Sequence, residues 1–200
     1  MSNEVANKNQ IIFKRRFFYL IMCKLCETKT VYEFTNKRKL CKNCFIRWFQ
    51  KKFLYTLRKF QMIKNGDIIS YKDRGDFREI VLEELLKKFF ENGNVRLIKN
   101  KGFGKIALAD SSDIVSYKIL HRLIEEKINS KEILPVEGKI IRPLYLFLDK
   151  EILLYARLRK LKFKKIPEKK SKISTFVDEM EKKHPEVKHS VVRSCLEIYG

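Results

Sequence analysis

The sequence predicts an α/β fold, a parallel sheet with flanking helices, preceded by a small zinc ribbon. Short apolar strands alternate with amphipathic helices from residue 62 onward, which is typical of a parallel sheet covered on its faces. Before that point, four of the five cysteines stand in two CxxC pairs. A chain of 200 residues that is 44% apolar can bury one substantial core and carry one small metal-stabilised unit.

The two CxxC pairs predict a metal site. They are Cys23-Lys-Leu-Cys26 and Cys41-Lys-Asn-Cys44, and each CxxC turn directs two thiolates at one ion. Between them, TVYEF alternates as a strand does and TNKRK is typical of a turn, so a hairpin can close a tetrahedral shell of four sulfurs. Structural Zn²⁺ is the first expectation, with an iron–sulfur or redox site as the alternative. No signal peptide precedes the cysteines, so we expect a reducing compartment rather than disulfides.

The charge of the chain predicts a polyanionic partner. There are 45 Lys and Arg against 24 Asp and Glu, a formal net charge of +21, which favours nucleic acid over small acidic molecules. The competing interpretation is a solvated surface in a Lys-rich composition. Lys or Arg interrupts every apolar run before it reaches the length of a membrane span, so we expect a soluble, cytoplasmic protein.

A basic amphipathic helix is predicted directly after the second CxxC pair. Apolar side chains recur there at helical spacing from Phe45 to Phe60, and basic side chains lie off that stripe. The stripe predicts core packing, and the basic residues are candidate RNA phosphate contacts. They are Arg47, Lys51, Lys52, Arg58 and Lys59. We therefore divide the chain into a polar, disordered tail (1–10), a zinc ribbon with its basic helix (11–61) and an α/β domain (62–200).

The α/β part is predicted from hydrophobic periodicity and from end signals. Apolar runs predict strands at 68–71, 104–109 and 140–144, whereas the stretch up to Lys101 is either a weak strand or a loop. Helices are predicted at 77–90, from the Asp110–Asp113 cap to about 127, from Asp149 through 160, at 171–183 and at 185–198. Ser171 or Ser174 and Pro185 are the start signals of the last two helices, and a linker is expected at 129–138. Because ligands bind beyond the carboxyl ends of parallel strands, we expect the functional loops after residues 72 and 109.

Four segments of the chain resemble a known family. CKNCFIRWFQKKFLYTLRKFQMIKNGD carries the resemblance most clearly, and GKIALADSSDIVSYKILHRL, IIRPLYLFLDKEILLYARL and FVDEMEKKHPEVKHSVVRS follow it in the same order. Together they resemble the tRNA-thiolating branch of the PP-loop ATP pyrophosphatases, from the double CxxC to the closing helices. The resemblance implies a reduced PP-loop fold, an adenine nucleotide hydrolase-like parallel sheet with flanking helices, over residues 62–200.

The chain departs from that family where the nucleotide would bind. The family's first loop reads Ser-Gly-Gly-x-Asp-Ser, and its backbone N–H groups and a helix N-terminus hold pyrophosphate. The matching stretch here keeps one glycine and gains a second aspartate; its residues are Lys72, Asp73, Arg74, Gly75 and Asp76, followed by Phe77. The second loop is reduced to Ala109, Asp110, Ser111, Ser112 and Asp113. ATP binding is therefore not expected, and no catalytic residue is assigned.

The cysteine distribution also departs from the active members of the family. Those members are expected to carry cysteines inside the α/β domain, to hold a cluster or a persulfide. This chain has none between Cys44 and Cys195, and Cys195 is expected to be a half-buried structural residue of the last helix. We expect no sulfur transfer by this chain alone.

The resemblance favours the non-catalytic member of the branch, on the Lys-Phe pair after the basic helix and the ending HSVVRS. It implies a tRNA-binding scaffold subunit, a pseudoenzyme, for 2-thiolation of the wobble uridine (U34) in cytoplasmic tRNAs. The implied partners are tRNA, a catalytic PP-loop thiolation subunit in a heterodimer and, through the complex, a ubiquitin-like sulfur carrier. Two alternatives stay open: an active ATP-dependent tRNA 2-thiolase with a diverged loop, and a zinc-ribbon module that binds RNA or the ribosome.

Overall fold

The computed structural model describes residues 22–125, 133–164 and 171–200. The predicted tail at 1–10 and the expected helix end near 127 lie outside these residues. The chain forms two compact units that divide between Phe49 and Gln50. This division falls inside a helix, whereas the sequence placed the end of the first part at residue 61.

The first unit is built on a two-stranded hairpin. β1 (Thr30–Glu33) pairs antiparallel with β2 (Lys39–Cys41), and a single bridge from Met22 to Lys29 precedes them. The turn between the strands places Lys37 at φ +63°. Helix α2 (Lys42–Lys59) begins immediately after β2 and continues into the second unit. The predicted strand, turn and helix around the CxxC pairs are confirmed.

Aromatic rings fill the interior of the first unit. Phe45 and Phe49 are fully buried, and Trp48 lies edge-on to Phe34 with ring centroids 4.7 Å apart. Tyr32 of β1 packs between these groups, 5.0 Å from Phe45. A unit this small has little aliphatic core, so these rings and the cysteine cluster are what hold the hairpin against the helix.

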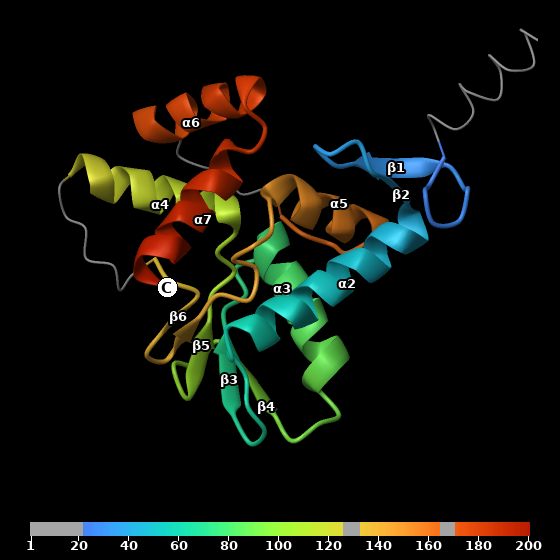
Figure 1. The fold of residues 1–200 in the computed structure, drawn as a ribbon. Helices are drawn as coiled ribbons and strands as arrows, with labels where there is room; N and C mark the ends of the chain where they lie inside the picture. Colours follow the sequence, from blue (N-terminus) through green and yellow to red (C-terminus); the bar gives the residue numbers. More distant parts are fainter. Residues whose placement is uncertain (1–21, 126–132, 165–170) are drawn as a thin grey trace, which may run out of the picture. The chain divides into compact units, whose positions relative to one another are not determined.

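The second unit contains a five-stranded sheet in the order β4-β3-β5-β7-β6 (Figure 1). The strands are β3 (Ile68–Tyr71), β4 (Arg96–Lys99), β5 (Lys105–Ala107), β6 (Val136–Glu137) and β7 (Ile140–Ile141). β4, β3, β5 and β7 run parallel, and β6 pairs antiparallel with β7 at the edge. The strand alternative for 96–99 is therefore correct.

Two parts of the sheet differ from the prediction. β6 lies in the expected linker, because Gly138 at φ +57° lets the chain reverse and pair Val136 with Ile141. The strand predicted at 140–144 ends at Ile141, since Tyr145 donates its backbone N–H to the Arg142 carbonyl in a turn.

Helices connect and cover the strands. They are α3 (Phe77–Phe90), α4 (Ser112–Ile124), α5 (Asp149–Leu158), α6 (Lys172–Lys183) and α7 (Val187–Tyr199). α3 packs against α5, and α4 packs against α7, with α6 in contact with both α4 and α7 (Figure 1). Each helix was predicted, with the α3 bounds correct to the residue. No helix of the described residues is both long and apolar enough to cross a membrane.

The helix caps follow the sequence signals at α4 and α6 and depart from them at α5 and α7. Asp76, Ser111 and Ser171 each accept a backbone N–H at the start of α3, α4 and α6. The prediction that Asp149 caps α5 is wrong. The cap position is Leu148, whose N–H is bound by the Glu151 carboxylate at 3.1 Å, and Asp149 is the first helical residue. α7 begins at Val187 with Glu186 at its cap position, two residues after the predicted start at Pro185.

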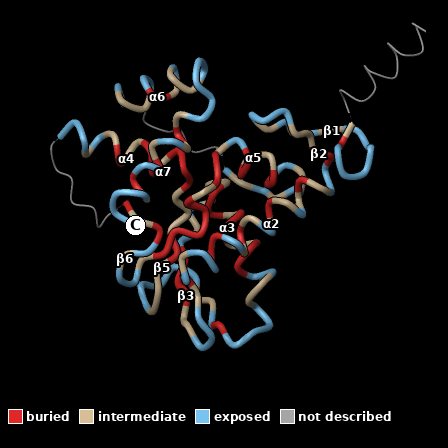
Figure 2. Tube along the Cα trace, viewed as in Figure 1, coloured by how far each residue is buried: buried red, intermediate tan, exposed pale blue. Residues whose placement is uncertain are grey.

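The buried residues of the second unit follow the strands and the inner sides of α3, α4, α5 and α7 (Figure 2). Between α4 and α7, Val115, Ile119, Val192 and Cys195 form one apolar cluster with Tyr145. Cys195 is 4% exposed, so it is a core residue, more deeply buried than the half-buried position expected for it.

Gly104 is required by the approach of two parallel strands. It has φ +75°, and a Cβ at this position would lie 2.3 Å from the backbone oxygen of Ile68 at the start of β3. We expect Gly104→Ala to lower the free energy of unfolding by about 2–4 kcal/mol, through both the clash and the strained φ. Urea unfolding followed by circular dichroism measures the change.

Gly102→Ala is the matched control, because Gly102 has open space around its Cα and no left-handed φ. Its free energy of unfolding should stay within about 0.5 kcal/mol of that of the wild type. Equal midpoints for the two variants would show that β3 and β5 do not approach as described.

Candidate metal centre and nucleotide-like cleft

The four cysteines of the CxxC pairs converge in the first unit. Cys41 is the last residue of β2, Cys44 lies in the first turn of α2, and Cys23 and Cys26 flank a turn closed by the Glu27 N–H on the Cys23 carbonyl. Their four Sγ atoms all lie within 4.8 Å of one another, with 3.3 Å between Cys26 and Cys41. The geometry therefore brings together the predicted ligand set, which could hold a metal ion.

The acidities of these thiols differ strongly. Burial opposes ionisation of Cys41, but hydrogen bonds from Thr28 and from the Cys44 backbone lower the pKa of its thiol to about 6. Burial and the adjacent Cys26 and Cys41 thiols raise the pKa of Cys44 to about 12. Four thiolates in so small a volume repel one another, and a bound cation removes that repulsion so that all four can be deprotonated.

In the second unit, the two predicted functional loops meet in one cleft of about 310 Å³. The cleft lies at the carboxyl ends of β3 and β5, where parallel sheets bind ligands. Lys72, Arg74 and Asp76 line it from the first loop and Ala109 and Asp110 from the second. The predicted location of the loops is correct.

Carboxylates of the chain itself bind the backbone N–H groups of the first loop. Glu79 accepts the backbone N–H of Arg74 at 2.6 Å and its Nε at 2.9 Å. Asp73 accepts the backbone N–H of Gly75 at 2.9 Å, and the hydrogen bond from Lys99 at 2.5 Å holds the pKa of this carboxyl below its usual value. The N–H groups that would face a bound phosphate in such a loop are thus directed at internal anions.

Arg78, the buried cation of the cleft lining, is held by carboxylates as well. It is 6% exposed, and its guanidinium forms a two-pronged ion pair with Asp149 at the start of α5, with 2.6 Å from Nε to Oδ1. Asp76, which caps α3, accepts from the same guanidinium at 3.2 Å. Arg78 therefore fixes α5 to α3 and is engaged within the protein.

The second loop is likewise part of the structural framework. Asp110 accepts from Lys118 at 2.7 Å and from Arg142 at 3.0 Å. Ser111 caps α4, and the Ser112 hydroxyl donates to the Tyr145 carbonyl at 2.8 Å. These contacts give the polar side chains of the second loop a structural role.

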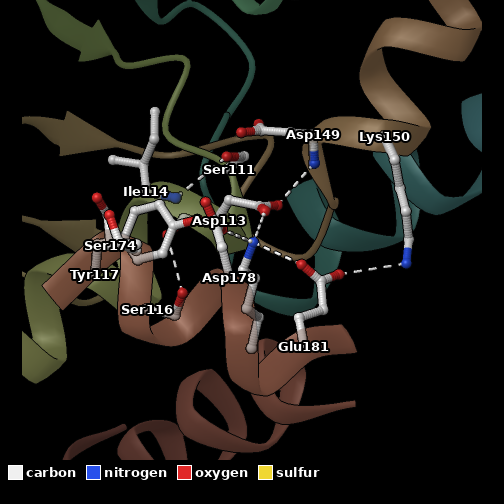
Figure 3. Close-up of polar contacts among 12 residues, drawn as sticks. Ser111, Asp113, Ile114, Ser116, Tyr117, Asp149, Lys150, Ser174, Asp178 and Glu181 are labelled. Carbon is white, nitrogen blue, oxygen red and sulfur yellow. Dashed lines mark hydrogen bonds and ion pairs between the residues drawn. The ribbon is translucent and has the colours of Figure 1, made fainter. Parts of the chain in front are cut away.

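Asp113 lies at the centre of a buried ion cluster (Figure 3). Its carboxylate accepts the backbone N–H of Asp149 at 2.8 Å and the ammonium of Lys188, from α7, at 2.6 Å. Lys188 also contacts Asp178 at 3.0 Å and Glu181 at 2.7 Å, both on α6. Although burial opposes its charge, the hydrogen bonds that Lys188 donates to Asp113 and Glu181 raise its pKa.

The predicted RNA contacts divide into two groups. Arg47, Lys51, Arg58 and Lys59 are exposed on α2. Lys52 differs from its predicted role as a phosphate contact. Its ammonium pairs with Glu151 at 2.9 Å and lies 4.6 Å from the centre of the Phe147 ring. Burial lowers the pKa of Lys52. This lysine is a structural cation and is removed from the candidate phosphate contacts.

Sequence reasoning missed the charged residues that complete both loops. For Glu79 a signal was available, because an acid three residues after the Asp76 cap is the spacing of a capping box. For Arg78, Asp149 and Lys188 no local signal exists, since their partners lie in other elements.

Comparisons with known proteins place the fold but assign no family. No family model matches the chain, and no curated protein matches it. Among solved structures, it is similar to the U34-tRNA thiolase NcsA from Methanococcus maripaludis with its [4Fe-4S] cluster, at a TM-score of 0.73 and 18% identity. The match covers 90% of this chain and 87% of that one. The chain therefore has the predicted α/β fold, which it shares with this thiolase, preceded by a hairpin whose four cysteines could form a zinc ribbon.

The metal centre predicts a difference between two cysteine variants. We expect Cys41→Ser to abolish metal binding, because three thiolates and a hydroxyl close the shell poorly. Cys195→Ser is the control, since Cys195 lies in the core of the second unit. Elemental analysis of both purified proteins measures the metal content per chain, and retention of a full equivalent by Cys41→Ser would contradict the assigned ligands.

The ion cluster predicts a large effect of Lys188→Met. Removing the ammonium leaves Asp113 buried without its cation, which we expect to cost about 3–5 kcal/mol in the free energy of unfolding. Lys182→Met, at an exposed lysine of α6, should change it by less than about 0.5 kcal/mol.

Urea unfolding of a double variant tests the cause. In Lys188→Met with Asp113→Asn the buried charge is gone, so part of the lost stability should return. An additive double variant would contradict the pairing.

Proposed function

We propose that this protein is a non-catalytic, tRNA-binding scaffold subunit for 2-thiolation of the wobble uridine (U34) in cytoplasmic tRNAs. One observation carries the proposal: a chain with the fold of a U34-tRNA thiolase has its phosphate loop filled by its own carboxylates, above all by Glu79. Within the branch that its motifs resemble, we propose that it corresponds to cytoplasmic tRNA 2-thiolation protein 2. The cytoplasm is the corresponding location.

The proposed absence of catalysis rests on the cleft and on the cysteines. Asp73 and Glu79 occupy the N–H groups on which an ATP phosphate would depend, and both would repel it. The neighbour is named with a [4Fe-4S] cluster, whereas this chain has no cysteine between Cys44 and Cys195. ATP hydrolysis and sulfur transfer are accordingly assigned to a catalytic PP-loop partner in a heterodimer, which would meet the ubiquitin-like sulfur carrier.

For the metal centre we propose a structural Zn²⁺. Tetrahedral zinc with bonds of about 2.3 Å separates its sulfurs by about 3.8 Å. The separations here, 3.3 Å for Cys26 to Cys41 and 3.6 Å for Cys26 to Cys44, are of that size. A four-iron cluster gives each thiolate its own iron and so needs sulfurs that stand further apart. Zinc is also consistent with a role in folding the hairpin, which has few aliphatic core residues.

The proposed tRNA contacts are the exposed cations of α2. Lys51 and Arg58 are seven residues apart and lie on one stripe of the helix. Arg47 is four residues before Lys51 and extends the same stripe. A stripe of cations on a rigid helix matches the regular spacing of backbone phosphates and supplies the bulk of nonspecific affinity. The +21 net charge supports the same partner.

Salt dependence of tRNA binding tests the proposed contacts. We expect Lys51→Gln and Arg58→Gln each to reduce the slope of log K against log salt by about one unit, because each removes one phosphate contact. Fluorescence anisotropy with labelled tRNA at several salt concentrations measures the slope. Lys172→Gln, at an exposed position of α6, should leave the slope unchanged.

Two results would contradict the proposal. AMP release by the purified chain with ATP and tRNA would favour the active thiolase. Unaltered wobble thiouridine in cells that lack the chain, together with no association with a catalytic PP-loop protein, would favour an RNA- or ribosome-binding module.

A further inference from the structure

An apolar groove of about 440 Å³ lies at the carboxyl end of α2, within the second unit. Leu54, Leu57 and Phe90 supply its apolar lining. Arg58, Gln61 and Lys64 line it with polar groups. The groove is separate from the nucleotide-like cleft, with which it shares no lining residue.

The groove continues the stripe that carries the proposed phosphate contacts. Lys51, Leu54 and Arg58 are three and four residues apart, so they follow one another along the same side of α2. A phosphate backbone that contacts Lys51 and Arg58 therefore passes directly over the groove. The distance along the helix from Lys51 to Arg58 is about 10 Å, at about 1.5 Å per residue, which is of the order of one to two nucleotides of a backbone.

The charged side chains that line the groove are two cations, Arg58 and Lys64. Both are exposed, and neither side chain forms an ion pair within the described residues, although the Asp67 carboxylate accepts the backbone N–H of Lys64 at 2.7 Å. Arg58 makes a single long hydrogen bond, 3.3 Å from its Nε to the Leu54 carbonyl, which leaves most of its guanidinium donors directed at solvent. Cations around an apolar groove favour a ligand that combines apolar surface with negative charge.

Gln61 adds a group that can form hydrogen bonds in two directions. It follows the end of α2 in the left-handed region at φ +47°, with its side chain exposed. An amide both donates and accepts, as does the Watson–Crick edge of a base. Glycine or asparagine is the usual residue in this left-handed conformation after a helix. The conformation of the backbone therefore does not account for a glutamine at this position.

We propose that this groove receives an unpaired base of the bound RNA, with the base against Phe90 and its flanking phosphates at Arg58 and Lys64. The inference rests on the proposed tRNA binding and names a subsite for it. Proteins recognise RNA mainly through splayed bases that lie on aromatic rings and bond through their edges. An apolar lining, one aromatic ring, one amide and two cations supply each of these parts.

An acidic peptide of a protein partner is the competing occupant. We favour the unpaired base for two reasons. The Gln61 amide can bond to the edge of a base, and Lys51 lies on the same side of α2, where it can contact the next phosphate. An acidic peptide requires neither feature. A test must therefore separate bases from phosphates and RNA from protein.

The test uses the full-length protein and two labelled RNA hairpins with the same stem. One has a loop of uridines, and the other has an abasic loop that keeps every phosphate. We expect the wild type to bind the uridine hairpin about tenfold more tightly, the typical effect of one base on an aromatic ring. Phe90→Ala should bind both hairpins equally, with the remaining affinity set by the phosphates.

Phe176→Ala is the matched control, because Phe176 is an exposed phenylalanine of α6, 61% accessible. It should retain the tenfold preference. Arg58→Gln should weaken both hairpins to a similar extent, because it removes a phosphate contact. Circular dichroism and urea unfolding confirm that each variant is folded.

Three outcomes overturn the inference. Equal binding of both hairpins by the wild type, with tRNA binding intact, removes the base subsite and leaves the proposed function standing. Failure of tRNA and both hairpins to bind at low salt removes the proposed function as well. Retention of the base preference by Phe90→Ala, with loss of association with the catalytic subunit, assigns the groove to a protein partner.

Discussion

A series of buried charges joins five helices of the second unit through Asp113. Arg78 of α3 pairs with Asp149 at the start of α5, and the Asp149 backbone donates to Asp113 of α4. Asp113 in turn holds Lys188 of α7, which also binds carboxylates of α6. Each ion is costly to bury alone and acceptable only beside its partners, so none of these helices can move without leaving a charge uncompensated.

This arrangement determines what the cleft can bind. Parallel sheets collect functional groups at the carboxyl ends of their strands, and here Arg78, Asp110 and Asp113 do lie there. Their charges are neutralised by neighbours in the same unit. The backbone N–H of Arg74 is likewise bound by Glu79. A ligand that used these groups would have to displace internal ion pairs, and in this structure the same groups hold the helices together.

The sequence predicted those elements whose signals are local. β3 and α3 were expected at their observed bounds, because a short apolar run and a helical spacing of apolar residues identify them without reference to other elements. The clustering of the four cysteines was also predictable, since CxxC spacing requires a common ion. The pairing of Asp113 with Lys188 was not, because the residues are 75 positions apart and either charge alone is typical of a surface. Lys52 was misassigned for the same reason: only the folded chain brings Glu151 and Phe147 to it.

The burial and ion pairing of each cation therefore indicate its role better than the net charge of the chain does. Lys52, Arg78, Arg142 and Lys188 all have buried side chains or carboxylate partners, so they contribute to the +21 without being able to contact a phosphate. Lys51, Arg58 and Lys64 are exposed and lie along or just beyond one helix. Their potential adds over a short distance with little internal screening, and an anionic backbone follows such a line more favourably than it follows scattered charges. This stripe, rather than the cleft, is therefore the surface on which we propose that RNA binds.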